Sequence, residues 1–137
     1  MVGKACTIKV TSVQSCGGTS DTTVETYQGN LTVRGDNYYL TYTRASEDTS
    51  VRAMINVGPE GMTMTQKGDV NSRLSFVTGS RTDNPYSTPA GTLTLSVTTK
   101  SLRYEAGDRG LTINLIYELA GGMEPVVTNM SITADYI

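Results

Sequence analysis

The stretch Leu111-Thr112-Ile113-Asn114-Leu115-Ile116-Tyr117-Glu118-Leu119 decides the fold class of this chain. Every second residue in it is large and apolar, and most residues between them are polar. Successive side chains of a β-strand point to opposite faces, so this period of two predicts a strand with one buried face. A helix would need a sustained apolar stripe at spacings of three and four residues, and no part of the chain has one.

Eight further stretches share this period of two. They are Lys4–Val13, Thr22–Val33, Asn37–Thr43, Val51–Val57, Met62–Lys67, Arg73–Thr78, Thr92–Thr99 and Val126–Ile137. Threonine is frequent in them, and its branched β-carbon favours strands over helices. The parity of the apolar residues changes near Gly29 and after Lys100. We therefore predict a bulge or bend near Gly29 and a bulge after Lys100.

The connections between these stretches are short and rich in turn residues, as in Gly35-Asp36-Asn37 and Gly58-Pro59-Glu60-Gly61. Such connections join neighbouring antiparallel strands. Because no helix is available to cover a sheet face, the sheet has to close on itself. A Greek-key sandwich needs a long crossover, and only Gly79–Gly91 is long. We therefore predict one all-β domain over residues 1–137, a single antiparallel meander closed into a barrel of about eight to nine strands.

The composition of the 137 residues excludes several classes of function. Eleven Lys and Arg against thirteen Asp and Glu leave a net charge of -2, and the isoelectric point is about 5.0. Nucleic acids and anionic membranes attract clustered positive charge, so we expect neither as a partner. The chain has no histidine, which excludes Ser-His-Asp and Cys-His catalysis and histidine-based metal sites. We expect no metal and no cofactor.

The N-terminal residues and the cysteines point to the cytoplasm. The first residues lack the apolar core of a secretory signal, and no apolar run approaches the ~20 residues of a membrane helix. Cys6 and Cys16 lie ten positions apart, in and just beyond a predicted strand. At about 3.3 Å per residue of extended chain, their separation is too large for a disulfide. We expect both thiols to be reduced.

Four motifs resemble a bacterial family in their order and spacing. They are Tyr38-Tyr39-Leu40-Thr41-Tyr42, Phe76-Val77-Thr78-Gly79, Tyr86-Ser87-Thr88-Pro89-Ala90-Gly91 and Ile116-Tyr117-Glu118-Leu119. Together they resemble the YwiB-like proteins, a domain of unknown function, over essentially the whole chain. The resemblance implies a calycin-like, lipocalin-type β-barrel in a small cytoplasmic protein, and it implies no activity. The chain lacks the Gly-x-Trp of secreted lipocalins and the helix pair of fatty-acid-binding proteins, so neither group supplies a ligand.

Three carboxylates within predicted strands are candidates for acid–base chemistry: Glu25, Glu118 and Asp135. Glu118 and Asp135 have the parity opposite to the apolar residues of their strands, so we expect them to face water. The chain has no Gly-x-Ser-x-Gly motif and no histidine that would activate a serine. Solvated carboxylates are the simpler interpretation, and we expect that the protein is not an enzyme.

The connection Gly79–Pro89 and three tyrosines are the candidates for a ligand site. As a lid over one barrel mouth, this connection would point Tyr86 inward as a stopper and place Arg81 against an acidic head group. Three tyrosines on apolar faces could contact the same ligand: Tyr38, Tyr42 and Tyr117. The simpler alternative is that Tyr86 plugs the barrel end and the other tyrosines fill the core with tethered hydroxyl groups.

Two classes of function remain open on these observations. In the first, the barrel binds a small hydrophobic or amphipathic ligand, with tyrosines and an arginine as polar anchors. In the second, side chains fill the barrel, and the protein is an interaction or structural module that acts through its outer surface or as a homodimer. Barrels of about eight strands lie at the boundary between a filled and a ligand-holding interior, so the strand count does not decide between them.

Overall fold

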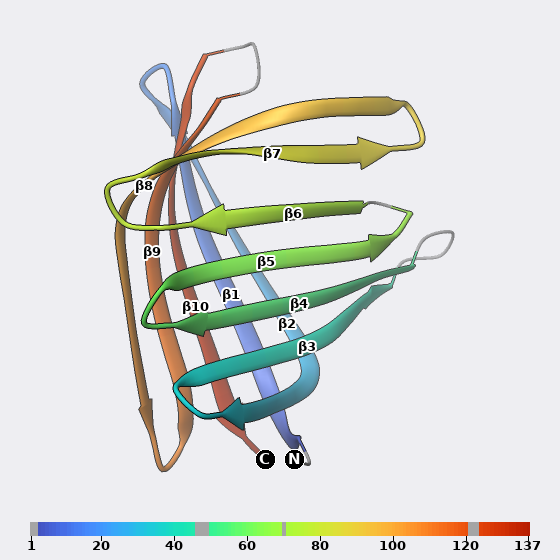
Figure 1. Cartoon of the computed structure of the whole chain (residues 1–137), viewed down its shortest axis with the longest axis vertical. Coiled ribbons are helices and arrows are strands. Elements are labelled where there is room, and N and C mark those ends of the chain that lie inside the picture. The colour runs from blue at the N-terminus through green and yellow to red at the C-terminus, as the bar shows by residue number, and fades with distance from the viewer. Residues whose placement is uncertain (1–2, 46–49, 70, 121–123) are drawn as a thin grey trace.

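The computed structural model describes residues 3–45, 50–69, 71–120 and 124–137, which form β-strands and short turns (Figure 1). The strands are β1 (Lys4–Cys16), β2 (Thr19–Arg34), β3 (Asn37–Ala45), β4 (Ser50–Gly58), β5 (Gly61–Gly68), β6 (Asn71–Phe76), β7 (Arg81–Thr88), β8 (Gly91–Gly107), β9 (Gly110–Ala120) and β10 (Val126–Tyr136). Each strand pairs antiparallel with the next one in the chain, and β10 pairs with β1. The predicted fold class is confirmed, since the chain is an all-β antiparallel meander closed into a barrel, with ten strands instead of eight or nine.

The additional strand is β7, which occupies most of the connection between residues 79 and 91 and pairs with β8 along its whole length. The prediction of a long loop over a barrel mouth is therefore wrong. The inward side chains of β7 are polar and give no apolar alternation: Thr82, Asn84 and Tyr86. Pro85 lies between them and is typical of a turn rather than of a strand interior. Arg81 and Tyr86 consequently belong to the barrel wall and not to a lid.

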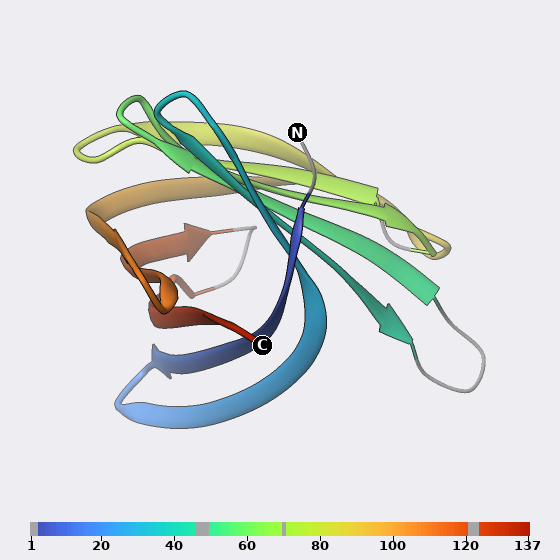
Figure 2. The ribbon, with the colours of Figure 1, turned by 90° about the horizontal axis from the view of Figure 1, so that it is seen from below.

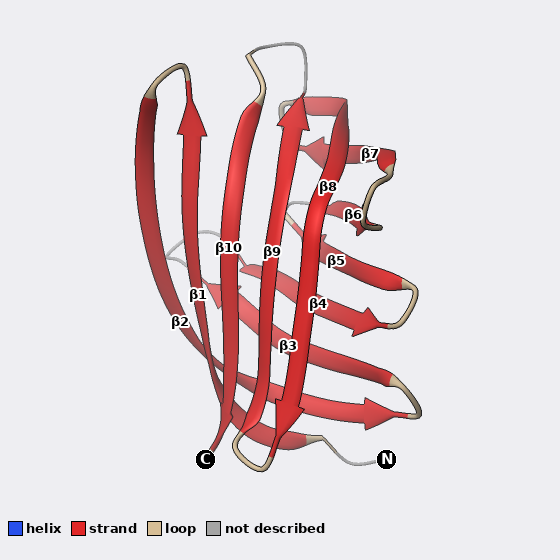
Figure 3. Cartoon of the chain, turned by 90° about the vertical axis from the view of Figure 1, so that its left-hand side faces the viewer, coloured by secondary structure: helices blue, strands red, loops and turns tan. Residues whose placement is uncertain are grey.

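The ten strands form two layers that cross each other. Figure 3 shows β1, β10, β9 and β8 side by side along the long axis, with β3 to β7 crossing behind them. Two long strands belong to both layers. β2 pairs with β1 through residues 19–31 and with β3 through residues 29–34, and Figure 2 shows it curving between the layers. β8 pairs with β7 through residues 91–98 and with β9 through residues 96–107.

We call the places where β2 and β8 pass between the layers corners, and the two corners differ in backbone geometry. The pairing of β8 with β9 shifts in register between Thr99 and Ser101, which confirms the predicted bulge after Lys100. β2 keeps a continuous register at Gly29, so no bulge lies there, but the strand bends as it changes partner, which was the other form that the prediction allowed (Figure 2). A Cβ atom at Gly29 would collide with the carbonyl oxygen of Thr41 and lie 2.7 Å from Ile8 Cδ1. Glycine therefore allows the close approach of backbones at this corner.

The prediction of a bulge or bend near Gly29 depends on the opposite parity of Val24 and Leu31. Leu31 is buried on the inner face, but Val24 lies on the outer face with 56% of its surface exposed. An exposed valine is ordinary on a protein surface, and here it carries no information about the inner face. The inner positions of β2 therefore follow the parity of Leu31 alone.

The interior of the barrel is occupied by large apolar side chains. The largest fully buried ones are Phe76, Ile8, Leu40, Ile55, Met62, Ile113, Leu115 and Ile132. Ile113 and Leu115 were predicted as interior positions and are fully buried. Leu95, an alternating apolar residue of β8, also faces inward, but it is only half-buried. Leu95 pairs with Asn84 of β7, but it precedes Ser96, where the pairing of β8 with β9 begins.

The two cysteines lie at opposite ends of β1 and both are free. Cys6 is fully buried, whereas Cys16 is half-buried and its thiol donates a hydrogen bond of 3.6 Å to Glu124 Oε2. Across the described ranges, no helix is long and apolar enough to cross a membrane.

Candidate functional site

The five residues predicted for a ligand site lie on two different faces of the barrel wall. Tyr38, Tyr42, Tyr86 and Tyr117 lie on the inner face, and Arg81 lies on the outer face. The inner tyrosines are also at different places along the wall. Their cross-strand partners are Val57 for Tyr38, Gly29 for Tyr42, Leu93 for Tyr86 and Thr99 for Tyr117. The structure therefore does not bring the five residues together as one site.

Three of these tyrosines pack against another aromatic ring. The pairs are Tyr27–Tyr42, stacked with 4.7 Å between ring centroids, Phe76–Tyr117, edge to face at 4.9 Å, and Tyr38–Tyr104, edge to face at 6.1 Å. Offset-stacked and edge-to-face pairs add stability beyond the burial of their area. Tyr42 and Tyr117 are 8% and 6% exposed, so their rings are part of the core.

The hydroxyl groups of the two buried tyrosines are held in the neutral form. Burial raises the pKa of Tyr42 above its usual value of 10.0, Arg44 acts against this shift and Glu25 adds to it. Burial also raises the pKa of Tyr117, and a hydrogen bond with Thr128 acts in the lowering direction. A phenol with a raised pKa is a weaker proton donor to a base and does not favour acid–base chemistry near neutral pH.

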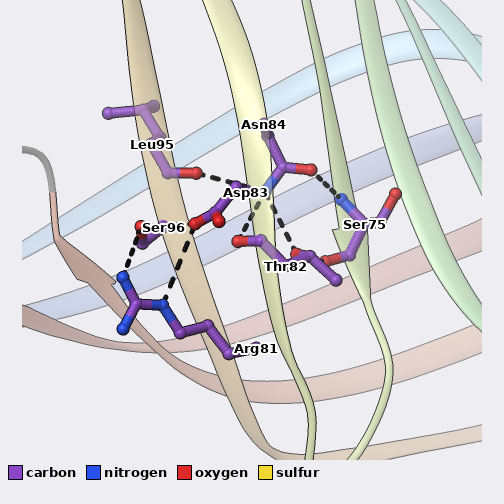
Figure 4. A network of polar contacts seen from close by, with 7 residues as sticks. All are labelled: Ser75, Arg81, Thr82, Asp83, Asn84, Leu95 and Ser96. Carbon is purple, nitrogen blue, oxygen red and sulfur yellow. Dashed lines mark hydrogen bonds and ion pairs between the residues drawn. The ribbon is translucent and has the colours of Figure 1, made fainter.

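Arg81 takes part in a small polar cluster on the outer face of β7 and β8 (Figure 4). Its guanidinium donates a hydrogen bond of 3.0 Å to Ser96 Oγ and lies 3.8 Å from Asp83 Oδ1. Ser96 Oγ in turn donates to Asp83 Oδ1 at 2.6 Å. The side chains of Arg81 and Asp83 are 68% and 65% exposed. The positive charge expected at the barrel mouth is therefore paired with a carboxylate on the outer surface.

The seam between β6 and β7 is held largely by side chains. Main-chain pairing is confined to Asn71 with Ser87 and Ser72 with Tyr86. Beyond these pairs the two strands separate, and Pro85 has no N–H that could continue the ladder.

Thr82 and Asn84 take over the missing main-chain hydrogen bonds of this seam (Figure 4). Thr82 Oγ1 donates to the carbonyl oxygen of Ser75 at 2.7 Å, and the N–H of Ser75 donates to Asn84 Oδ1 at 3.1 Å. Asn84 Nδ2 also donates to the carbonyl oxygen of Leu95 at 3.3 Å. Asn84 is only 4% exposed, so these bonds satisfy polar groups that water does not reach.

A hollow of about 940 Å³ lies over this seam on the outer face of β3 to β7. We call it the outer groove and define it by residues on its floor and sides: Tyr39, Met54, Asn56, Thr63, Thr65, Lys67, Arg73, Ser75, Val77, Pro85 and Ser87. Met54 and Val77 are large apolar side chains with 37% and 41% of their surface exposed. The groove therefore combines apolar contact surface, hydroxyl and amide groups, and positive charge.

A second hollow, of about 600 Å³, continues the outer groove toward β2. The two hollows share Met54, Thr65 and Lys67, and the second one adds Gln28 and Arg52. Sequence reasoning missed both because their residues occupy mainly the polar positions of alternating strands, which are typical of a solvated face. The only signal was an exposed methionine among these polar positions.

The carboxylates considered for catalysis do not meet in one place. Glu118 lies 4.0 Å from Lys100 in an ion pair on the outer face, and Asp135 is exposed on β10. Both face outward, as predicted. Glu25 is half-buried on the inner face of β2, opposite Val10. Within the described part of the chain, no three Cys, Asp or Glu side chains are grouped to hold a metal ion.

Two comparisons with known proteins give results that agree. A family model described as Domain of unknown function (DUF1934) matches residues 8–132. The chain is similar to the crystal structure of the ywiB protein from Bacillus subtilis, with 24% identity and a TM-score of 0.90, over 98% of this chain and 93% of that one. A comparison with curated proteins gives no match. The likeness at this identity concerns the fold, and the family match extends over most of the sequence. The chain therefore belongs to the DUF1934 family, a domain of unknown function.

Proposed function

We propose that this protein is a non-enzymatic binding module that holds a segment of a partner protein in the outer groove. The observation that carries the proposal is the contrast between the two faces of the barrel wall. Fully buried apolar side chains occupy the interior, whereas the outer face of β3 to β7 has a hollow of about 940 Å³. A barrel filled in this way serves as a rigid scaffold for its outer surface.

The composition of the outer groove suits a protein segment. Met54 and Val77 offer exposed apolar surface that a partner's side chains can cover. Asn56, Thr63 and Ser75 are cross-strand partners on β4, β5 and β6, and they supply a row of polar groups across the groove. Protein interfaces that form and dissociate combine apolar and polar area in this way, with polar contacts at the rim. An extended segment would match the strands that line the groove.

The proposal is tested by photo-crosslinking in the cells that make the protein. A benzophenone amino acid replaces Met54 in the groove, and in a matched control it replaces Val24, an exposed apolar residue on the outer face of β2. We expect a discrete crosslinked product from position 54 and none of that mass from position 24. The proposal is overturned if position 54 gives no product or if both positions give the same ones.

The second candidate function is the binding of a small hydrophobic or amphipathic ligand inside the barrel. One observation favours it: Tyr27, Met64, Leu74 and Leu119 face inward but are only partly buried. A fluorescent fatty acid and a neutral analogue distinguish the two candidates. Saturable binding that is lost in Leu74→Glu but kept in Met54→Glu would support the interior ligand. On the proposal made here, neither probe binds in a saturable manner.

We also propose that the protein acts in the cytoplasm. The partner segment can belong to a second copy of this chain, in which case the protein is a homodimer. Cys6 and Cys16 lie too far apart along β1 to be joined, so the fold needs no oxidising compartment for a disulfide between them. If the partner segment comes from a second copy of this chain, native mass spectrometry of the purified protein shows a dimer, and the Met54→Glu variant shows a monomer.

A further inference from the structure

We propose that the outer groove selects an acidic partner segment, which it recognises through Arg52, Lys67 and Arg73. This inference rests on the proposed function and specifies the chemistry of the partner. It starts from the distribution of charge: the chain as a whole carries a net charge of -2, but these three positive residues gather at one end of the hollowed face.

Arg52 and Lys67 are direct cross-strand partners of β4 and β5. Residues that oppose each other in an antiparallel pair project from the same face, with their β-carbons about 4.5–5.5 Å apart. Two like charges in that position lower the stability of the sheet. Both side chains are exposed, and Lys67 lines both hollows. A bound carboxylate between them would turn this repulsion into attraction.

Arg73 extends the positive patch across β6. It pairs with Thr65 of β5, which places it diagonally from Lys67 on the same outer face. The two ion pairs formed by described residues involve other cations, Arg81 and Lys100. Within the described ranges, the three groove cations therefore have no carboxylate within 4.0 Å.

The nearby carboxylates of the described chain do not neutralise this patch. Asp69 follows β5, and its Oδ2 accepts a hydrogen bond of 2.9 Å from the N–H of Ser50. Glu60 lines the groove from the β4–β5 turn, which is the end of these strands remote from Lys67. The groove thus has a positive end and an acidic end, which gives an acidic segment a preferred orientation.

A protein segment fits these residues better than a nucleic acid does. Single-stranded nucleic acids are bound by positive charge along a whole groove together with several aromatic rings on which bases stack. Among the described residues, Tyr39 is the one aromatic side chain that lines the outer groove, and the positive charge lies at one end of the groove only. The side-chain carboxylates of a peptide, in contrast, form charge-assisted hydrogen bonds with clustered Arg and Lys.

The test uses a fluorescein-labelled peptide of alternating glutamate and valine, as long as one strand, and the full-length protein. The groove variant is Arg52→Gln with Lys67→Gln and Arg73→Gln. The matched control removes the same charge from exposed residues elsewhere, as Lys9→Gln with Arg103→Gln and Arg109→Gln. We expect the groove variant to weaken peptide binding by about tenfold or more and the control by less than about twofold. A peptide of glutamine and valine should bind the wild type as weakly as the glutamate peptide binds the groove variant.

Three outcomes would overturn the inference: equal losses in both triple variants, no difference between the glutamate and glutamine peptides, or tighter binding of an oligothymidylate of similar length. Folding is checked by thermal unfolding, where Arg52→Gln alone should raise the midpoint because it removes a like-charge neighbour. The crosslink from position 54 tests the proposed function, which is binding of a partner segment in the outer groove, independently of this inference. If that crosslink forms but the groove variant and the wild type bind the glutamate peptide equally well, the proposed function holds and the inference of an acidic partner is wrong.

Discussion

Leu115 and Asn114 are neighbours in β9 with opposite environments. Leu115 is fully buried in the barrel, and Asn114 is exposed on the outer face. We expect Leu115→Ala to lower the free energy of unfolding by about 2–5 kcal/mol, because it removes buried methyl groups and leaves a cavity. Asn114→Ala should change it by less than about 0.5 kcal/mol. Urea unfolding of both variants measures the difference, and equal losses would contradict a wall with one buried face.

Cys6 and Cys16 should differ in reactivity although both are free thiols. Burial raises the pKa of Cys6, with a further contribution from Asp135, and its side chain is inaccessible. Desolvation and the hydrogen-bonded carboxylate of Glu124 raise the pKa of Cys16, but part of that residue is open to solvent. A thiol-specific reagent should therefore modify Cys16 slowly in the native protein and Cys6 only after unfolding. Denatured, unreduced protein should titrate with both sulfhydryls, and a value of zero would mean that they form a disulfide.

The two buried tyrosines make stability fall at alkaline pH. Because burial raises the pKa of Tyr42 and Tyr117 above 10.0, the folded protein retains these protons at a pH where the unfolded chain releases them. The stabilisation is complete below pH 10.0 and is lost as the pH rises through the folded-state values. Tyr42→Phe and Tyr117→Phe should each flatten this fall in unfolding free energy. A fall that is as steep in Tyr42→Phe as in the wild type would refute the assignment.

At the scale of elements, the seam between β6 and β7 depends on one amide side chain. Asn84→Ala leaves the N–H of Ser75 and the carbonyl oxygen of Leu95 without this partner in a partly buried place. We expect a loss of about 1–3 kcal/mol in unfolding free energy. Hydrogen exchange at the Ser75 amide should also speed up, because β6 has few other bonds there. Asp83→Ala, on the exposed face of the same strand, is the control, and the seam assignment fails if both variants behave alike.

Most strands of this barrel could be predicted because their inward residues are apolar. β9 and β10 are buried at alternating positions, and this alternation can be read directly from the residue types. β7 could not be found in this way, since the seam that it forms needs polar inward residues, Thr82 and Asn84, to replace main-chain bonds. The same hydrogen bonds that hold the strand in place therefore remove its sequence signal.

The candidate site was harder to predict than the fold. Tyr42 and Tyr117 were correctly placed on apolar faces, but Arg81 was assigned to a mouth that β7 does not form. The outer groove depends on how far β6 and β7 separate, and on which strands oppose Arg52 and Arg73. Both depend on how neighbouring strands pair, and pairing cannot be predicted from the alternation of residues within one strand.

For the whole molecule, the start of β1 and the end of β10 lie side by side in the wall. β1 pairs with β10 from Cys6 opposite Tyr136 onward, and the N–H of Ile137 donates to the carbonyl oxygen of Ala5 at 3.2 Å. A circular permutant that joins these ends through a short glycine-serine linker and opens the exposed turn between Gly17 and Gly18 should keep the native fold. Opening β9 between Asn114 and Leu115 should abolish folding. Circular dichroism and thermal unfolding distinguish the two, and loss of the fold in the first permutant would contradict this prediction.

The pairing of β1 with β10 also has a consequence for the synthesis of the protein on the ribosome. Among the ten described strands β1 is made first, whereas β10, which covers its second edge, is made last. Until then the nascent chain exposes a row of free main-chain N–H and C=O groups, which can join to another growing chain. The barrel can close only once β10 has been made, and closure brings together segments that are separated by more than 100 residues of sequence. When several ribosomes translate one mRNA at the same time, their nascent chains lie close together. Pairing of β1 with a strand of a neighbouring chain is therefore favoured most in that situation.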